Sequence, residues 1–307
     1  MTTAAIPISI IYTKNAKNEC EEIANLGIQI ETLVPSISQP KRQCIGFGKT
    51  AVGEPVFIKL VKKNPIVKKT YLLNERNALR FLQGHTGDTN ISVPRVVSFR
   101  QTDKHDILLT TRITAQLARS LSSRKLAQSM LLAIRSLHMT KLTAADSKEF
   151  NLSKRGAIFY AAAFPYLFIK TSLNHPRYMR MFIKAFWVFY RLLPAVFRSR
   201  MVLSHRDVTP DNILASEKQY YLIDFQYAAI TSEAFDYASS YRSIIGNKSV
   251  SRAFKKEMLR QLGNIPGFND AFVCLSIYYA FMGLIDRNFP KKRTIEFLQV
   301  LQEMIHI

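Results

Sequence analysis

Acidic side chains are scarce in this chain of 307 residues: 22 Asp and Glu stand against 43 Lys and Arg, giving a net charge of +21. Such an excess favours an anionic partner, such as nucleic acid, an anionic lipid surface or a phosphorylated substrate. The scarcity is complete in residues 151–206, which contain no Asp or Glu while Lys, Arg and aromatic residues recur throughout. The missing negative charge is therefore concentrated in one segment.

Cysteine and long apolar runs are scarce as well. Three cysteines, an odd number, exclude a disulfide-based scaffold and favour a reducing compartment. The longest uncharged apolar stretches, 156–169 and 271–285, fall short of the 18 or so residues of a spanning helix. No basic region precedes the apolar start of the chain, so a signal peptide is not expected. The scattered His and Cys residues lack zinc-ligand spacing. These features predict a cytoplasmic protein.

The first third of the chain reads as short strands separated by turns. Hydrophobic and β-branched residues predict strands at 28–34, 43–47, 55–61, 95–98 and 107–110. One helix is expected among them, with Asn74 as its N-cap and Gly84 at its end. Gly46 and Gly48 are expected inside the second strand, where a pair of glycines alone is weak support for a phosphate loop.

Helical periodicity dominates after residue 113, notably over 117–142 and between 157 and 197. A compact hairpin interrupts it, with strands expected at 213–215 and 220–225. We therefore predict an α+β fold of two parts. Residues 1–110 form a small β-rich lobe with one helix, and residues 111–307 form a larger, mostly helical lobe.

Three oxygen-bearing side chains lie around this hairpin. Asp207 and Asn212 belong to the loop before it, and Asp224 follows its second strand. Oxygen ligands of this kind suit hard divalent cations, above all Mg²⁺. A carboxylate that stays free of metal can orient a hydroxyl nucleophile and accept its proton.

The order of these residues resembles a known family. His205-Arg206-Asp207 with Asn212, followed by Ile223-Asp224-Phe225, resembles the catalytic loop and metal-binding segment of the protein-kinase-like superfamily. Thr209 and Gln226 replace the Lys and Gly usual in protein kinases. The segments 222–228 and 235–238, with 135–138, instead resemble the choline kinase and aminoglycoside phosphotransferase branch. The resemblance spans residues 28–285 and implies a bilobal kinase-like fold.

The resemblance also implies cofactors and roles. ATP and Mg²⁺ are the expected cofactors, with residues 1–110 binding the nucleotide and residues 111–307 carrying the catalytic loop and the acceptor. Lys59, aimed by Glu75, would hold the phosphates, and Asn212 and Asp224 would hold the metal, while Asp207 would act as the base. Ser36 and Ser38 stand where a glycine-rich phosphate loop is usual, and residues 109–113 are the expected hinge. His138 and Asp236 are expected to brace the catalytic loop.

The acid-free segment lies where the acceptor is expected to bind. Aminoglycosides and choline are cations, so this segment favours a neutral or anionic hydroxyl acceptor, such as a sugar of a lipopolysaccharide core or another glycolipid at a membrane surface. Its basic and aromatic residues can alternatively belong to an ordinary helical core. An antibiotic kinase and an inactive kinase-like scaffold remain alternatives, and a nucleic-acid binder is a further one that rests on charge alone.

Overall fold

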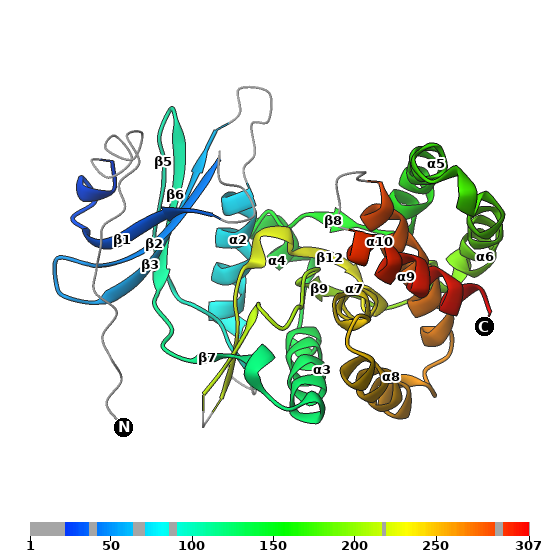
Figure 1. Ribbon diagram of the computed structural model, residues 1–307. Coiled ribbons are helices and arrows are strands. Elements are labelled where there is room, and N and C mark those ends of the chain that lie inside the picture. Colours follow the sequence, from blue (N-terminus) through cyan, green and yellow to red (C-terminus); the bar gives the residue numbers. More distant parts are fainter. Residues whose placement is uncertain are drawn as a thin grey trace. The chain divides into compact units, whose positions relative to one another are not determined.

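The computed structural model describes residues 22–36, 42–63, 71–85, 91–216, 219–285 and 291–306. The chain divides into two compact units. Unit 1 comprises Met1–Gly84 and Val93–Thr114, and unit 2 comprises His85–Ser92 and Ala115–Ile307. Unit 1 is built on a β-sheet and unit 2 is mostly helical (Figure 1), so the predicted α+β fold is confirmed.

Unit 1 contains a five-stranded antiparallel sheet in the order β1-β2-β3-β6-β5. Alternating side chains of the strands form its core, in which Val56, Ile58 and Leu60 of β3 are buried. All five predicted strands are present: β1 (Gln29–Pro35), β2 (Gln43–Lys49), β3 (Pro55–Lys62), β5 (Val96–Gln101) and β6 (His105–Thr111).

Gly46 and Gly48 lie inside β2, as expected. A Cβ at Gly46 would collide with the Thr32 carbonyl of β1, and one at Gly48 would lie 2.6 Å from the Gln29 carbonyl oxygen. The register of β1 and β2 shifts between Ile30 and Thr32, which brings the two backbones close at this point. Close strand approach therefore accounts for both glycines.

The helix of unit 1, α2 (Tyr71–His85), is longer than predicted. Asn74 lies inside it rather than at its N-cap, and Gly84 lies inside its last turn. The reason is Leu72, which is buried and extends the apolar stripe of Ala78, Leu79 and Leu82 by one turn toward the N-terminus. The predicted helix is correct and ends within one residue of Gly84, but its predicted N-cap is wrong.

Unit 2 holds two small sheets and most of the helices. One sheet has the order β4-β11-β10-β7 and the other the order β8-β12-β9. Their strands are β4 (Ile91–Ser92), β7 (Gln116–Leu117), β8 (Lys154–Arg155), β9 (Met201–Ser204), β10 (Ile213–Ala215), β11 (Tyr220–Leu222) and β12 (Ala229–Ser232). The helices are α3 (Ser123–Met139), α4 (Ala144–Glu149), α5 (Ala157–Asn174), α6 (Met179–Arg198), α7 (Ala234–Ile244), α8 (Lys248–Leu262), α9 (Phe268–Leu284) and α10 (Lys291–Ile305).

The central helix of unit 2 is α9, which is apolar on every side and almost wholly buried. A helix with no polar face is stable only where neighbours cover it, and α5, α6, α7, α8 and α10 all pack against α9 (Figure 1). Aromatic rings fill the space between them, with the ring of Phe164 stacked 3.8 Å from that of Phe189. None of the described helices combines the length and apolar character needed to cross a membrane.

Candidate functional site

A buried ion pair joins the sheet and the helix of unit 1. Lys59 lies in β3 on the face opposite Ile58 and Leu60, and its Nζ donates to both carboxylate oxygens of Glu75 in α2, at 2.8 and 2.9 Å. Lys59 is 8% exposed and Glu75 is 3% exposed. The carboxylate therefore fixes the direction of a flexible ammonium group, as the sequence predicts.

The predicted phosphate-binding serines lie after β1. Ser36 is buried, and its backbone N–H donates to the Gln43 carbonyl at 2.7 Å, which closes the β1–β2 pair. This N–H is thus engaged within the sheet. Ser38 lies outside the described residues.

In unit 2, β9 leads directly into the predicted catalytic loop. The side-chain amide of Asn212 donates to the carbonyl oxygen of Asp207 at 2.8 Å and to its carboxylate at 3.2 Å. The backbone N–H of Asn212 closes a turn onto the Thr209 carbonyl at 3.0 Å. Asn212 therefore holds Asp207 in place across the loop, and the structure brings these two predicted residues together.

His205 connects this loop to the segment that carries Asp224. Its Nε2 donates to the Ile223 carbonyl at 2.8 Å, and its Nδ1 accepts the Asp207 N–H at 3.3 Å. Its ring also lies edge-on to Phe225, with centroids 4.5 Å apart. These contacts tie the backbone of Asp207 to the segment that carries Asp224.

Asp224 ends the hairpin in a left-handed conformation, with φ 68° and ψ 60°. The predicted strand 220–225 therefore stops at Leu222, and a short 3₁₀ helix begins at Phe225. Asp residues tolerate this backbone region better than most others do. The turn redirects the chain at the carboxylate itself, next to the loop that carries Asp207.

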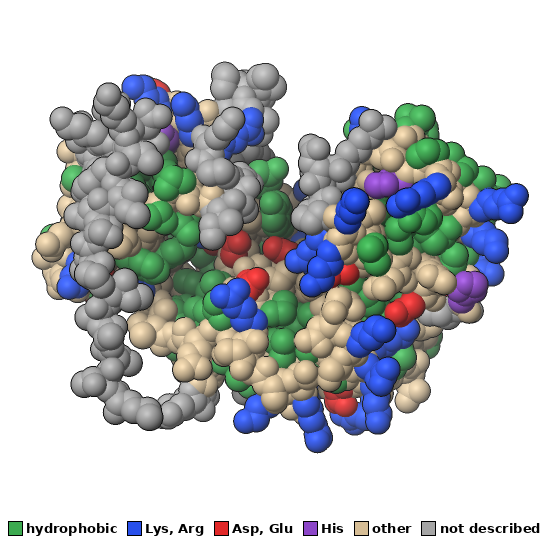
Figure 2. Space-filling view, in the orientation of Figure 1, with side chains coloured by type: hydrophobic (Ala, Val, Ile, Leu, Met, Phe, Trp, Pro, Cys, Tyr) green, Lys and Arg blue, Asp and Glu red, His purple; other side chains and the backbone are tan. Residues whose placement is uncertain are grey.

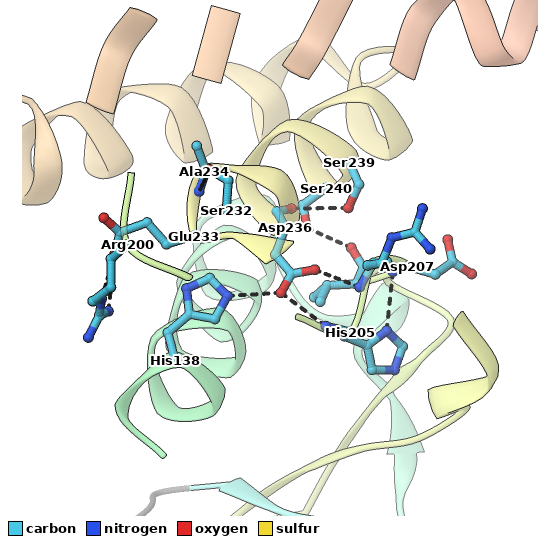
Figure 3. Close-up of polar contacts among 12 residues, drawn as sticks. His138, Arg200, His205, Asp207, Ser232, Glu233, Ala234, Asp236, Ser239 and Ser240 are labelled. Atoms are coloured by element: carbon cyan, nitrogen blue, oxygen red, sulfur yellow. Dashed lines mark hydrogen bonds and ion pairs between the residues drawn. The ribbon is translucent and has the colours of Figure 1, made fainter. Parts of the chain in front are cut away.

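Asp236 of α7 braces the predicted catalytic loop. It is fully buried, and its carboxylate accepts Nε2–H of His138 at 2.9 Å and the backbone N–H groups of His205 at 3.1 Å and Arg206 at 2.7 Å (Figure 3). Burial raises the pKa of Asp236, but these hydrogen bonds and the charge of His138 outweigh it and hold the pKa below its usual range. The predicted bracing roles of His138 and Asp236 are confirmed.

Arg206 is buried within the loop and contacts the residues around it. Its backbone is left-handed at φ 68°, and its side chain is buried over the ring of Phe235, with Cζ 4.8 Å from the centroid. Its Nη1 donates to the Tyr227 carbonyl at 3.3 Å, and the Tyr279 hydroxyl donates to the Arg206 carbonyl at 2.9 Å. These contacts stabilise the turn that presents Asp207.

The environment of Asp207 adjusts its acidity. Burial raises the pKa of Asp207, and the nearby charge of Asp224 raises it further. His205, Arg242 and the hydrogen bond from Asn212 act in the opposite direction. A buried carboxylate with a raised pKa is a better proton acceptor than an exposed one.

Sequence reasoning missed Arg242, which lies in α7. Its Cζ lies 4.4 Å from the ring centroid of Tyr279 and 5.4 Å from that of Phe297. Its Nε is buried without a hydrogen-bond partner, and among the described residues no carboxylate lies within 4.0 Å of its guanidinium group. Its distance in sequence from Asp207 gives no signal of their proximity, which arises because α7 packs on this loop, with the Ser240 hydroxyl donating to the Val208 carbonyl at 2.8 Å.

The donor set in unit 2 fits a magnesium ion. The amide nitrogen of Asn212 points to Asp207, which leaves its oxygen as a ligand, and Asp224 supplies a carboxylate. The mutual repulsion of Asp207 and Asp224 is of the kind that a divalent cation relieves. Within the described ranges no group of three His, Cys, Asp or Glu gathers as a metal cluster.

The sequence was compared with family models and with curated proteins. Residues 53–269 match the family described as the phosphotransferase enzyme family. No curated protein matches the chain.

Solved structures resemble the fold over nearly the whole chain. A thermostable mutant of an aminoglycoside phosphotransferase, in a ternary complex with ADP and hygromycin B, is 12% identical at a TM-score of 0.70, covering 94% of this chain and 97% of that one. An aminoglycoside 2'-phosphotransferase in complex with GDP is 16% identical at a TM-score of 0.60, covering 95% and 99%. A spectinomycin phosphotransferase with ADP and spectinomycin is 16% identical at 0.54, covering 93% of each. These likenesses confirm the predicted kinase-like fold.

Proposed function

The chain belongs to the phosphotransferase enzyme family, and we propose that it transfers the γ-phosphate of ATP to a hydroxyl group of a non-protein acceptor. The observation that carries this proposal is the Asp207–Asn212 pair, held beside Asp224 by His205. The solved relatives whose complexes hold ADP or GDP support the use of a nucleotide.

In the proposed reaction, Asp207 accepts the hydrogen bond of the acceptor hydroxyl and aims its oxygen at the γ-phosphorus. The new oxygen–phosphorus bond forms as the bond to the β–γ bridging oxygen breaks, ADP leaves, and the hydroxyl proton passes to Asp207. Base catalysis of this kind contributes roughly 10²–10⁴-fold to the rate. Lys59, aimed by Glu75, binds the α- and β-phosphates, and the Ser36 and Ser38 hydroxyls donate to phosphate oxygens.

Asn212 and Asp224 would hold Mg²⁺, which supplies neutralisation of the charge on the phosphate oxygens. We further propose the roles expected from the sequence. Residues 1–110 bind the nucleotide, and residues 111–307 carry the catalytic loop and bind the acceptor. The backbone of residues 109–113 is the proposed hinge for the base of the nucleotide.

For the acceptor, we propose a neutral or anionic sugar, such as one in the core of a lipopolysaccharide or another glycolipid. Two observations support an acceptor that is not a cation. Residues 151–206 contain no Asp or Glu. Arg242 acts on the pKa of Asp207, and no described carboxylate neutralises it. A glycolipid acceptor lies in a membrane, so we propose that the enzyme works at the cytoplasmic face of one.

The second candidate is an antibiotic kinase, favoured by the solved relatives that bind hygromycin B and spectinomycin. A panel of glycolipids, neutral and phosphorylated sugars and aminoglycosides, incubated with ATP and Mg²⁺ and examined by mass spectrometry, separates the two. We expect one added phosphate on a sugar or glycolipid. Phosphorylation of an aminoglycoside alone would overturn the acceptor, and the absence of any product together with no nucleotide-induced thermal shift would favour an inactive scaffold.

A further inference from the structure

One surface of unit 2 has no explanation in the proposed chemistry. Helices α5 and α6 pack against each other, with the hydroxyl of Tyr190 donating to the Ala161 carbonyl at 3.0 Å and the rings of Phe164 and Phe186 stacked at 5.9 Å. Both helices also pack on α9. Their faces turned away from α9 therefore lie on the same side of the unit, and that combined surface is named here the α5–α6 face.

The α5–α6 face is apolar and exposed. In α5, Ile158, Tyr166 and Ile169 lie on its outer side at helical spacing, and Ile158 is 73% exposed. In α6, Met179, Ile183 and Trp187 repeat every fourth residue, and Trp187 is 68% exposed. Figure 2 shows hydrophobic side chains grouped with Lys and Arg over these two helices. Exposed apolar side chains that gather on one surface in this way mark an interaction surface.

The composition of α5 resembles that of the buried helix α9. Like α9, α5 is apolar on every side, and Lys170 is its only charged residue. The outer side of α9 is covered by other helices, whereas the outer side of α5 is exposed. A helix without a polar face is stable in water only if something covers it. The sequence of α5 therefore indicates an apolar environment beyond the folded unit.

A row of cations borders the apolar residues. Along α6, Arg180, Lys184, Arg191 and Arg198 follow the apolar row on its side away from α5, and each is exposed. Within the described part of the chain, none of the four forms an ion pair. Unpaired cations next to exposed aromatic and aliphatic side chains are the features of a helix that lies in a membrane interface.

We propose that the α5–α6 face binds the surface of an anionic lipid bilayer, with the outer side chains of both helices among the acyl chains and the cations of α6 on lipid phosphates. Charge complementarity favours this occupant over a second copy of the chain, since residues 151–206 carry no acid and two such faces would repel each other. This proposal rests on the membrane setting of the proposed function and assigns that setting to one surface.

Trp187 makes the test direct because it is the only tryptophan in the protein. The full chain is mixed, without nucleotide or acceptor, with vesicles of phosphatidylcholine and phosphatidylglycerol in equal parts, or of phosphatidylcholine alone. We expect a blue shift of the emission, quenching by brominated acyl chains and co-sedimentation with the mixed vesicles only. Absence of the shift and of quenching, or sedimentation without quenching, would overturn the assignment.

Two pairs of variants locate the surface. R180E/K184E is compared with R252E/K256E, a pair with the same spacing on the exposed side of α8. I158S/I183S is compared with I295S, an exposed isoleucine of α10. We expect vesicle affinity to fall about tenfold or more in the α5–α6 variants and to stay within twofold in the controls. An equal loss in both members of a pair would mean that overall charge or hydrophobicity, not this face, drives binding.

Further outcomes complete the test. Concentration-dependent dimerisation by light scattering, with Trp187 shielded in the absence of lipid, would overturn the proposal in favour of a second copy. Retention on duplex DNA that R180E/K184E abolishes, without vesicle binding, would overturn it in favour of nucleic acid. The variant D207N is expected to bind vesicles like the unaltered protein, so failure of the catalytic proposal and failure of this one give different results.

Discussion

Asp236 and His138 form a buried hydrogen-bonded pair, 2.9 Å from Nε2 to Oδ2, next to the proposed catalytic loop. The same carboxylate accepts the backbone N–H groups of His205 and Arg206. The side chain of Asp236 on α7 therefore fixes the backbone of the two residues that precede Asp207. The conformation of the loop therefore depends on the carboxylate of Asp236, which lies 29 residues after Asp207 in the sequence.

We predict that D236N destabilises the protein by about 3 kcal/mol, because the amide that replaces one oxygen cannot accept a backbone N–H. Urea unfolding at neutral pH measures this change. The control is E233Q, near the start of α7, where the exposed pair with Arg200 contributes less than about 1 kcal/mol. Equal effects of the two substitutions would contradict the bracing role.

The lowered pKa of Asp236 also gives a pH dependence. A carboxyl whose folded pKa lies below its unfolded value stabilises the fold above the unfolded value and loses that contribution as pH falls through the folded one. We therefore expect the stability gap between the unaltered protein and D236N to narrow below about pH 4. A gap that stays constant down to the acid transition would contradict this assignment.

Asp207 is predicted to behave in the opposite way. Its pKa is raised by burial, so its ionised form is less favourable in the folded protein than in the unfolded chain. At neutral pH, D207N is thus expected to be at least as stable as the unaltered protein while losing roughly 10²–10⁴-fold in kcat. The acidic limb of the kcat profile should lie above the ordinary Asp range. Thermal melts and rate profiles measure both, and a large loss of stability in D207N would contradict the description of its environment.

The Lys59–Glu75 pair allows a test that separates folding from activity. K59M removes the cation that neutralises the buried Glu75 carboxylate and is expected to cost about 3–5 kcal/mol. In K59M/E75L both charges are absent, so most of this stability should return, whereas turnover should not. Recovery of turnover in the double variant would show that Lys59 acts only through the fold.

Arg242 is predicted to set acceptor preference. We expect Arg242 to donate a charged hydrogen bond to an anionic acceptor, so R242Q should lower kcat/KM for that acceptor about tenfold to a hundredfold and leave the KM for ATP unchanged. Removal of this cation should also raise the pKa of Asp207. R252Q on the exposed side of α8 is the matched control. An unchanged preference between neutral and anionic acceptors in R242Q would exclude the role.

Local sequence patterns were sufficient for much of this architecture. The apolar and β-branched residues at 55–61 predicted the strand that carries Lys59, and the His205-Arg206-Asp207 order located the loop. What could not be predicted depends on tertiary packing. The N-terminal end of α2 lies earlier than predicted because Leu72 is buried, and the position of Arg242 follows from how α7 lies on α9. The short strands β4 and β7 exist only through their pairing with the hairpin.

The central claim is that Asp207 serves as the base for phosphate transfer to a hydroxyl acceptor. The most direct measurement is transfer of labelled γ-phosphate from ATP to the acceptor that the panel identifies, compared between the unaltered protein and D207N under equal nucleotide occupancy. We predict labelled product from the unaltered protein and a loss of roughly 10²-fold or more in D207N. Equal rates of labelling by the two proteins would contradict the account.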